Sequence, residues 1–466
     1  MTDHRGPDSV FIRRLPDLAE RAGSASRARL RAGRPLGPLD GVRIAVKDNI
    51  DVAGVPTTNG SVVDASAGPV ERDAAVVRRL RDHGLVVVGK TNLSELAFSG
   101  LGTNPHYGSP VNPLSTVEPL VAGGSSSGSA VAVAAGLVPL ALGTDTSGSV
   151  RVPAAFCGVV GYKASDHLLP RDGVRTLSST LDSIGILART VGDLGLLAAA
   201  LGATTPRAAG GVRLVVPEGD DVVARCRPDV HSWFEDEIRR LERIDGVSVE
   251  RRPIPALRLA QDLMDQHGTI VAAEALERYG HLLDDPRGLD PAVARRLRAA
   301  ASRAGSVGVV RRRMPSLRAR VIRELGGALL VCPTVRHGPP AIREVTASPD
   351  AFDRLNTSTL ATTMLLSYLG MPGVSLPSGR GRSLGFGLLV SGQRGSDGQV
   401  LRAATRLAKA TEDDALLSQP PSLALTALAE NWSSTTMRVR PTMAASSPRA
   451  PSSSAMCLVA RGRLSR

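Results

Sequence analysis

Two clusters of glycine and hydroxyl-bearing residues lie in the first third of the chain. The first is Gly123-Gly124-Ser125-Ser126-Ser127-Gly128-Ser129, the second is Thr144-Asp145-Thr146-Ser147-Gly148-Ser149, and small apolar residues separate them. Successive backbone N–H groups in such turns can bind an anion or an oxyanion. The serine hydroxyls in the same turns are candidate nucleophiles. The two clusters therefore indicate either nucleophilic attack on a carbonyl group or the binding of an anionic ligand.

The choice of basic residues is a second chemical signal. Only Lys47, Lys90, Lys163 and Lys409 are lysines among the 57 basic residues, and the rest are arginines. An arginine stays charged and cannot accept a proton, whereas a buried lysine can be neutral. Each lysine is therefore a candidate base, although chance retention of an ordinary charge explains any single one equally well.

Both clusters resemble the signature region of the amidase signature family, serine hydrolases that cleave carboxamides with a Ser–Ser–Lys triad. The similar stretch runs from Val121 to Gly161, and the resemblance extends over about residues 40–200. It implies that Ser149 is the nucleophile, that Ser125 is a bridging serine after a cis peptide bond, and that Lys47 is the base. Ser125 and Ser149 are 24 residues apart, the family's usual spacing. This chemistry requires an uncharged Lys47 near neutral pH, which burial favours.

The resemblance also implies roles for the residues around this triad. The backbone N–H groups of Thr146, Ser147 and Gly148, together with that of the nucleophile itself, would form the oxyanion hole. Asp145 and Arg151 would support the loop from behind. No metal ion and no organic cofactor are implied, and the four cysteines have neither a paired nor a metal-binding spacing.

Two positions depart from the usual clusters of the family. Ser127 and Ser147 stand where glycine is common, and both changes resemble allophanate hydrolases, which act on a small urea derivative. Beyond them, Ala164-Ser165 replaces the usual Pro-Thr. The resemblance predicts an amidase that converts the carboxamide of a small molecule to a carboxylate and ammonia or an amine. Allophanate hydrolase and the A subunit of glutamyl-tRNA(Gln) amidotransferase are the alternatives.

Two interpretations from outside this family compete with it. Gly124 to Gly128 also fits the GxSxG nucleophile elbow of α/β-hydrolases, with Ser126 as nucleophile. That elbow needs a preceding strand, and residues 119–122 form a poor one. The second competing interpretation is a nucleotide-binding protein, but no GxxxxGK[ST] or GxGxxG motif follows a predicted strand.

The composition favours a globular enzyme with a small-molecule substrate. The chain has 466 residues, 42% hydrophobic residues and a net charge of +13, but only 3% aromatic residues to stack on bases. Nucleic acid is therefore not expected as a partner, except for tRNA if the chain is one component of an amidotransferase that acts with partner subunits. We expect no membrane partner and a cytoplasmic location because no apolar leader is evident, and a homodimer is possible.

The elements that must position the candidate residues follow an α/β pattern. A strand over 41–47, a helix over 73–83 and a strand over 85–89 predict a βαβ unit with parallel strands. The resemblance implies the amidase signature fold, a large mixed β-sheet covered on both sides by α-helices. We expect one domain over residues 1–418, with a variable, substrate-shaping region at about 205–330 that contains helices over 231–243, 256–279 and 291–323. Residues 419–466 are predicted to be a low-complexity tail.

Overall fold

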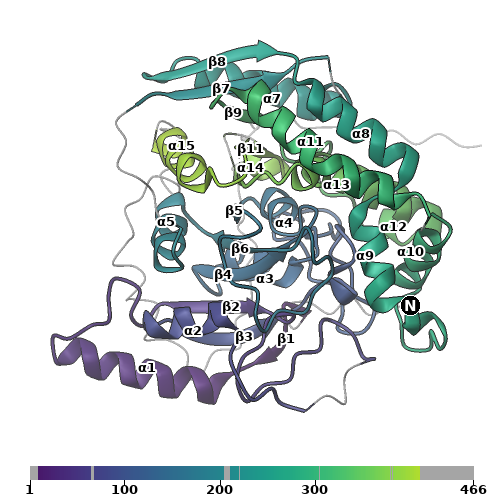
Figure 1. The fold of residues 1–466 in the computed structure, drawn as a ribbon. Coiled ribbons are helices and arrows are strands. Elements are labelled where there is room, and N and C mark those ends of the chain that lie inside the picture. Colours follow the sequence, from purple (N-terminus) through teal and green to yellow (C-terminus); the bar gives the residue numbers. More distant parts are fainter. Residues whose placement is uncertain are drawn as a thin grey trace, which may run out of the picture. The chain divides into compact units, whose positions relative to one another are not determined.

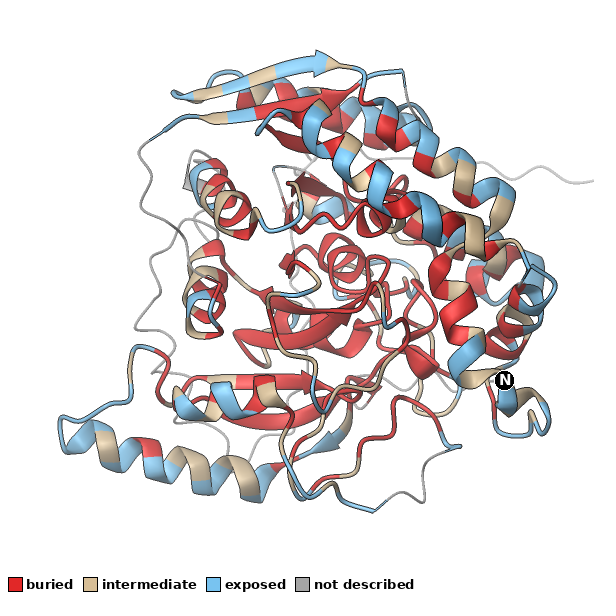
Figure 2. Ribbon diagram, in the orientation of Figure 1, coloured by how far each residue is buried: buried red, intermediate tan, exposed pale blue. Residues whose placement is uncertain are grey.

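The computed structural model describes residues 9–409, except for 64–67, 204–209, 220, 304, 378 and 380. At its centre lies one 11-stranded sheet with the strand order β1-β3-β2-β4-β6-β5-β10-β11-β9-β7-β8. The strands are β1 (Phe11–Arg14), β2 (Arg43–Lys47), β3 (Val86–Thr91), β4 (Leu140–Asp145), β5 (Val160–Lys163), β6 (Ser183–Ala188), β7 (Val212–Pro217), β8 (Val247–Arg252), β9 (Leu329–Pro333), β10 (Gly373–Pro377) and β11 (Gly387–Ser391). Most of these strands are buried, so the sheet is the core of the described residues (Figure 2).

The sheet is mixed. β2 is parallel to both of its neighbours, β3 and β4, and β7 is parallel to β8 and β9. The other neighbouring pairs are antiparallel. The predicted βαβ unit is therefore confirmed as β2, α2 and β3.

Helices connect and cover the strands (Figure 1). The α-helices are α1 (Pro16–Arg31), α2 (Ala75–Asp82), α3 (Ser127–Ala134), α4 (Arg151–Phe156), α5 (Val191–Ala200), α6 (Asp221–Ala224), α7 (Pro228–Leu241), α8 (Pro255–His267), α9 (Ile270–Tyr279), α10 (Pro291–Ala301), α11 (Val307–Leu325), α12 (Ile342–Val345), α13 (Pro349–Tyr368), α14 (Gly381–Leu384) and α15 (Asp397–Lys409).

Alternate residues of the central strands pack into different hydrophobic clusters. Ala45 of β2 and Ala141 of β4 pack with the apolar residues of α3, whereas Ile44 and Val46 pack with those of α2 and α5. Because successive side chains of a strand point to opposite faces, helices must cover both faces of the sheet. The predicted fold class, a large mixed sheet between layers of helices, is confirmed.

Two predicted helices are each divided in the structure. The segment 256–279 forms α8 and α9, because Gly268 ends α8 with a φ of +84°, a conformation that side-chain-bearing residues avoid. The segment 291–323 forms α10 and α11. The resulting helices pack on one another, α8 against α11 and α9 against α10, and α8 also packs against α13.

Parts of the sequence-based description remain predictions. The tail expected at residues 419–466 lies outside the described residues, so the predicted boundary after residue 418 is not tested. In the part of the chain that is described, no helix is both long and apolar enough to cross a membrane.

Candidate active site

The first catalytic candidate lies at the carboxyl end of β2. Because β2 and β4 are parallel neighbours, their carboxyl ends meet at the same edge of the sheet. Lys47 ends β2, and its Nζ atom lies 2.7 Å from Ser125 Oγ and 2.9 Å from Thr144 Oγ1. Asn49 Nδ2 donates to the same threonine hydroxyl at 2.9 Å. The structure thus brings the predicted base and the predicted bridging serine into direct contact.

The surroundings of Lys47 favour its neutral form. The side chain is fully buried, and this burial lowers the pKa of Lys47 to about 7, against the opposing effect of the carboxylates of Asp145 and Asp182. No carboxylate forms an ion pair with Lys47 among the described residues, since its polar neighbours are hydroxyl and carbonyl groups. A lysine of this kind can accept a proton near neutral pH.

The first glycine–serine cluster forms a turn that leads into α3. The peptide bond between Gly124 and Ser125 is cis. Gly124 N donates to the carbonyl of Gly100 at 2.7 Å, and Ser126 N donates to the carbonyl of Ser149 at 3.0 Å. This second hydrogen bond joins the backbone of the predicted nucleophile, Ser149, to Ser126, which directly follows the bridging Ser125.

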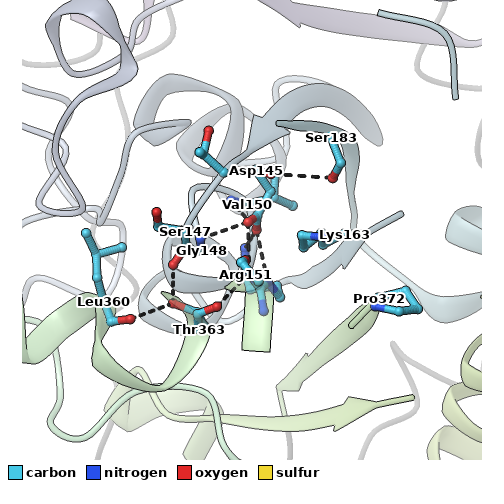
Figure 3. Close-up of polar contacts among 12 residues, drawn as sticks. Asp145, Ser147, Gly148, Val150, Arg151, Lys163, Ser183, Leu360, Thr363 and Pro372 are labelled. Carbon is cyan, nitrogen blue, oxygen red and sulfur yellow. Dashed lines mark hydrogen bonds and ion pairs between the residues drawn. The ribbon is translucent and has the colours of Figure 1, made fainter. Parts of the chain in front are cut away.

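The second cluster wraps around the carboxylate of Asp145 (Figure 3). Asp145 accepts hydrogen bonds from Gly148 N at 2.8 Å and Val150 N at 3.1 Å. Arg151 contacts the same carboxylate with two nitrogens, Nε at 3.0 Å and Nη2 at 2.9 Å. Burial alone would raise the pKa of Asp145, but Arg151, with help from Lys163 and Val150 N, lowers it to about 2. The loop is therefore built around a permanent ion pair.

Helix α13 holds this loop from the other side. Thr363 Oγ1 donates to the carbonyl of Ser147 at 2.6 Å (Figure 3). Arg151 Nη2 donates to Ser367 Oγ at 2.7 Å. Gly148 has a φ of +131°, and a Cβ atom added there would lie 2.1 Å from Thr363 Oγ1. Only glycine fits this position, because it has neither a Cβ atom nor the usual restriction on φ.

A third support comes from the loop before β6. Thr146 Oγ1 donates to Asp182 Oδ1 at 2.6 Å, while Asp182 Oδ2 accepts from the backbone N–H of Leu177 and Ser178. Burial raises the pKa of Asp182. The same loop contacts Glu274 of α9, which accepts from the hydroxyl of Ser178. A chain of hydrogen bonds thus joins the variable helical region to the nucleophile loop.

The backbone N–H groups predicted for the oxyanion hole differ in their contacts. Gly148 N donates to Asp145, so it is already occupied. Within the described residues, the N–H groups of Thr146, Ser147 and Ser149 have no hydrogen-bond acceptor. Among the described residues, the hydroxyls of Ser125 and Ser149 also form no hydrogen bond with each other. The hydroxyl of Ser147 also has no hydrogen-bond partner in the described part of the chain.

The other lysines and the cysteine considered as candidates have contacts or burial that fit a structural role. Lys90 forms a buried ion pair with Asp48 at 2.8 Å. Lys163 Nζ contacts the carbonyl of Ala164 at 3.3 Å, and burial lowers the pKa of Lys163 to about 8. Cys157 is buried in an environment that raises its thiol pKa, which disfavours a thiolate nucleophile. No group of three or more metal-ligating side chains suited to a metal ion occurs among the described residues.

The nucleophile elbow around Ser126 is not supported by the structure. That arrangement requires a strand immediately before the serine, but the residues before Ser126 form only isolated bridges at Leu120 and Val121. The hydroxyl of Ser126 is buried and donates to the carbonyl of Thr144 at 3.3 Å.

Sequence analysis missed four residues that surround the candidate triad. Thr144 and Asn49 are neighbours of predicted residues, so the two motifs themselves contained the signal. Asp182 and Thr363 lie far from both clusters in the sequence, and no local pattern points to them. Their roles depend on the packing of α13 and of the loop before β6, which only the fold reveals.

Two cavities lie beside α10 and α13, and the predicted triad lines neither of them. One, of about 880 Å³, lies between the loop of residues 103–109, the start of α10 and the residues before α13. The second, of about 680 Å³, lies among α8, α9, α10 and α13. Phe98 and Asn356 line the second cavity, and Asn356 Oδ1 accepts from Gly100 N at 2.8 Å. Gly100 is the residue whose carbonyl binds the turn before Ser125.

Comparison with known proteins identifies the family. The family model described as Amidase matches residues 7–401. The chain belongs to the amidase family. The 2-amino-5-chloromuconic acid deaminase of Comamonas testosteroni is 35% identical over 380 residues, covering 78% of this chain and 79% of that protein.

Two further amidase-family proteins are similar over most of this chain. The A subunit of the glutamyl-tRNA(Gln) amidotransferase of Symbiobacterium thermophilum is 34% identical over 441 residues, covering 85% of this chain and 88% of that protein. The solved structure of the allophanate hydrolase of Kluyveromyces lactis superimposes with a TM-score of 0.75 at 25% identity, covering 87% of this chain and 67% of that one. These relatives have different activities, so membership of the amidase family does not by itself fix the substrate.

Proposed function

We propose that this amidase-family chain hydrolyses the carboxamide of a small molecule to a carboxylate and ammonia or an amine. Lys47, Ser125 and Ser149 are its catalytic residues. The observation that carries the proposal is the 2.7 Å contact between Lys47 Nζ and Ser125 Oγ, made by a buried lysine whose pKa is lowered to about 7. An amide needs an activated nucleophile and a proton for its leaving nitrogen, and this contact can supply both.

The proton moves through the bridging serine. Neutral Lys47 accepts the proton of Ser125, which accepts the proton of Ser149 as its oxygen attacks the amide carbon. The C–N bond then breaks while the proton returns through Ser125 to the leaving nitrogen, which leaves an acyl ester on Ser149. Water, deprotonated along the same route, cleaves this ester and releases the carboxylate.

Backbone N–H groups of the nucleophile loop stabilise the negative oxygen of the tetrahedral intermediate. Those of Thr146, Ser147 and Ser149 remain available for this task, whereas Gly148 N binds Asp145. Asp145 and Arg151 hold the loop in shape through their ion pair and take no part in the proton transfer. The oxyanion hole proposed here therefore omits Gly148.

A serine-directed fluorophosphonate tests the triad. We expect the intact mass of the wild-type protein to increase by one adduct, the adduct to be absent in Ser149→Ala, and labelling of Lys47→Ala to be slowed by roughly 100-fold or more. Ser126→Ala is the matched control, because it removes a neighbouring buried hydroxyl and should keep the adduct. An adduct that persists in Ser149→Ala and disappears in Ser126→Ala would assign the nucleophile to Ser126 instead.

Two related activities remain as alternatives. Allophanate hydrolysis is favoured by Ser127 and Ser147 at positions where glycine is common, and a role in an amidotransferase is favoured by the 34% identity to the A component of such an enzyme. Comparing the rates at which the purified chain hydrolyses allophanate and simple amides separates an allophanate hydrolase from a general amidase. Activity that requires co-purified partner chains and glutamine as ammonia donor would identify the second.

A further inference from the structure

The carboxylate of Glu274 on α9 is buried against the loop that precedes β6. Only 6% of its side chain is exposed. Its Oε2 atom accepts hydrogen bonds from Ser178 Oγ and, at 3.1 Å, from Thr180 N, while Oε1 accepts from Thr180 Oγ1. A buried carboxylate costs free energy unless hydrogen bonds satisfy its oxygens, and three of those bonds come here from one short stretch of chain. Glu274 therefore holds residues 178–180 at a defined place beside α9.

Arg311 of α11 binds Glu274 together with a second, exposed carboxylate. Its Nη2 atom lies 3.2 Å from Glu274 Oε1 and 2.9 Å from Glu277 Oε1. The side chains of Arg311 and Glu277 are 43% and 60% exposed, so water screens this ion pair. Among the described residues, Glu277 forms no hydrogen bond with residues 178–180. Glu277 thus shares the helix, the charge and the arginine of Glu274 but lacks its contacts with the loop.

Ser178 connects Glu274 to Asp182. The hydroxyl of Ser178 binds Glu274, its backbone N–H donates to Asp182 Oδ2 at 3.1 Å, and its carbonyl accepts from Asp182 N at 3.0 Å. Leu177 N donates to the same carboxylate oxygen of Asp182 at 2.9 Å. Two buried carboxylates therefore bind one serine, and a displacement of Ser178 must also displace Asp182 or break its contacts.

Asp182 in turn binds the nucleophile loop. Its Oδ1 atom accepts from Thr146 Oγ1 at 2.6 Å. The backbone N–H of Thr146 belongs to the proposed oxyanion hole, whose donors act only at about 2.7–3.1 Å from the developing negative oxygen. A small displacement of Thr146 is therefore enough to weaken this stabilisation. Three side-chain hydrogen-bonding residues, Ser178, Asp182 and Thr146, thus connect Glu274 to the site of the reaction.

From these contacts we propose that Glu274 is a positioning residue for the oxyanion hole, because it holds Ser178, which holds Asp182, which holds Thr146. This inference rests on the proposed amidase function and adds a residue of the variable region to it. The variable region then influences the rate of the chemical step as well as the shape of the substrate site. The Thr146 N–H acts on the tetrahedral intermediate, so loss of Glu274 should reduce the rate of reaction more than the affinity for the reactant.

The kinetics of labelling by the serine-directed fluorophosphonate test this role without a known substrate. Its phosphonyl oxygen gains negative charge during attack by Ser149 and needs the same N–H donors. In Glu274→Gln an NH2 group replaces one carboxylate oxygen and cannot accept from Ser178 or Thr180. We expect the maximal labelling rate, kinact, to fall about 10-fold, while the half-saturating concentration, KI, changes less than about twofold.

Glu277→Gln is the matched control for the loss of charge. It removes a carboxylate bound to the same Arg311, three residues further along α9. We expect it to change kinact and KI less than about twofold. Equal effects of Glu274→Gln and Glu277→Gln would overturn the proposal, because charge near Arg311 and not contact with the loop would then explain them.

A second pair of variants tests the connection at Ser178. Ser178→Ala removes the hydroxyl that binds Glu274 but keeps the backbone contacts with Asp182, and it should lower kinact roughly 3- to 10-fold. The neighbouring Ser179 is exposed, and Ser179→Ala should change kinact less than about twofold. A Ser178→Ala protein that is labelled as fast as wild type overturns the proposed connection. This pair also replaces the comparison at Glu274 if Glu274→Gln does not fold.

A double-mutant cycle distinguishes positioning from a general loss of stability. Thr146→Val removes the hydroxyl that binds Asp182, so it interrupts the connection at its last step. Adding Glu274→Gln to Thr146→Val should lower kinact less than about twofold, compared with about 10-fold in the wild-type background. The same 10-fold loss in both backgrounds would exclude an effect through Thr146. Denaturant midpoints of all four proteins control for folding.

Amide hydrogen exchange separates failure of this proposal from failure of the proposed function. The N–H groups of Leu177, Ser178 and Asp182 are hydrogen-bonded, and their exchange should be faster in Glu274→Gln than in wild type or Glu277→Gln. Absence of labelling of wild-type Ser149 removes the hydrolytic function, while the exchange of residues 177–182 still decides whether Glu274 holds this loop. Normal labelling, with exchange and kinact both unchanged in Glu274→Gln, retains the amidase and overturns the positioning role.

Discussion

At the scale of single residues, the site depends on one lysine that burial keeps close to neutrality. The hydroxyl of Ser125 is a strong enough partner to orient Lys47 but carries no charge that would retain its proton. Two carboxylates, those of Asp145 and Asp182, oppose this effect and raise the pKa of Lys47. Neither contacts Lys47 directly, and both accept hydrogen bonds from other groups. The same residue in water would be fully protonated at neutral pH and useless as a base.

The pH dependence of the proposed hydrolysis follows from this lysine. Only the deprotonated form of Lys47 can accept the Ser125 proton, so kcat/KM should rise with pH and level off above the Lys47 pKa of about 7. Steady-state rates between pH 5.5 and 9 measure this rise of kcat/KM, the acidic limb of the pH profile. Lys47→Arg keeps a cation that cannot deprotonate and should lose activity roughly 100-fold or more across the range. A flat profile below pH 7 contradicts the assignment of Lys47 as the base.

A single methyl group at Gly148 should disrupt the nucleophile loop. Gly148→Ala places a Cβ atom in contact with Thr363 Oγ1 and requires alanine to adopt a φ of +131°. We expect a fall of roughly 2–4 kcal/mol in the free energy of unfolding together with loss of fluorophosphonate labelling. Chemical denaturation measures the first effect and intact mass the second. Full labelling of Gly148→Ala would show that the loop tolerates a different shape.

At the scale of elements, α13 and the loop before β6 determine the shape of the nucleophile loop. Thr363 binds the Ser147 carbonyl, Ser367 binds Arg151, and Asp182 binds the hydroxyl of Thr146. Each contact acts on a different residue of one short loop. The loop therefore depends on two elements that are distant in the sequence as well as on its own ion pair.

Neighbouring threonines of α13 offer a matched test of this dependence. Thr363→Val removes the donor to the Ser147 carbonyl and should cost about 1–3 kcal/mol of stability, with a fall in kcat. Thr362 is buried too, but its hydroxyl has no partner among the residues that the structure describes, so Thr362→Val should be neutral or slightly stabilising. Denaturant midpoints and kcat for both variants make the comparison. Equal effects of the two substitutions would mean that the Thr363 hydrogen bond does not support the loop.

Asp182→Asn should lower kcat and also shift the pH dependence of kcat/KM. Loss of the carboxylate disturbs the contact with Thr146 and places an amide donor near the N–H groups of Leu177 and Ser178, so kcat should fall roughly 10- to 100-fold. Loss of its negative charge also lowers the pKa of Lys47, so the acidic limb of kcat/KM should move to lower pH. Asp172→Asn, on the exposed part of the same loop, should change neither. A limb that stays in place or moves upward argues against this electrostatic coupling.

At the scale of the whole chain, local patterns predicted the strand–helix–strand unit of β2, α2 and β3, whereas the large mixed sheet was predicted from the resemblance to the amidase signature family. The glycine–serine clusters and Lys47 have types and spacings that are visible without a structure, and the fold places Lys47 and Ser125 in contact. Asp182 and Thr363 could not be predicted, because their roles arise from contacts between segments far apart in sequence. The division of 256–279 at Gly268 was missed because a single glycine within an apolar pattern does not always end a helix.

The buried Lys163 gives the chain a measurable dependence of stability on pH. Its folded-state pKa of about 8 lies below the unfolded value of about 10.4, so the unfolded chain binds the proton more tightly between these values. Stability should therefore rise with pH in this window. Lys163→Met should be more stable than wild type by up to about 3 kcal/mol at pH 7, and this advantage should shrink by about 2 kcal/mol at pH 9.5. Denaturant unfolding at the two pH values measures the difference, and a constant difference would contradict a depressed pKa.

The hydrogen bond between Thr363 and Ser147 joins residues 216 positions apart, and this separation has a consequence during synthesis. A ribosome extends a chain at roughly 5–20 residues per second, so the support of the loop emerges roughly 10–40 s after the loop itself. For that time the growing polypeptide contains every reactive side chain of the triad without the loop shape that they need. Hydrolytic activity should therefore begin only when translation has passed α13, so that incomplete chains are released without it.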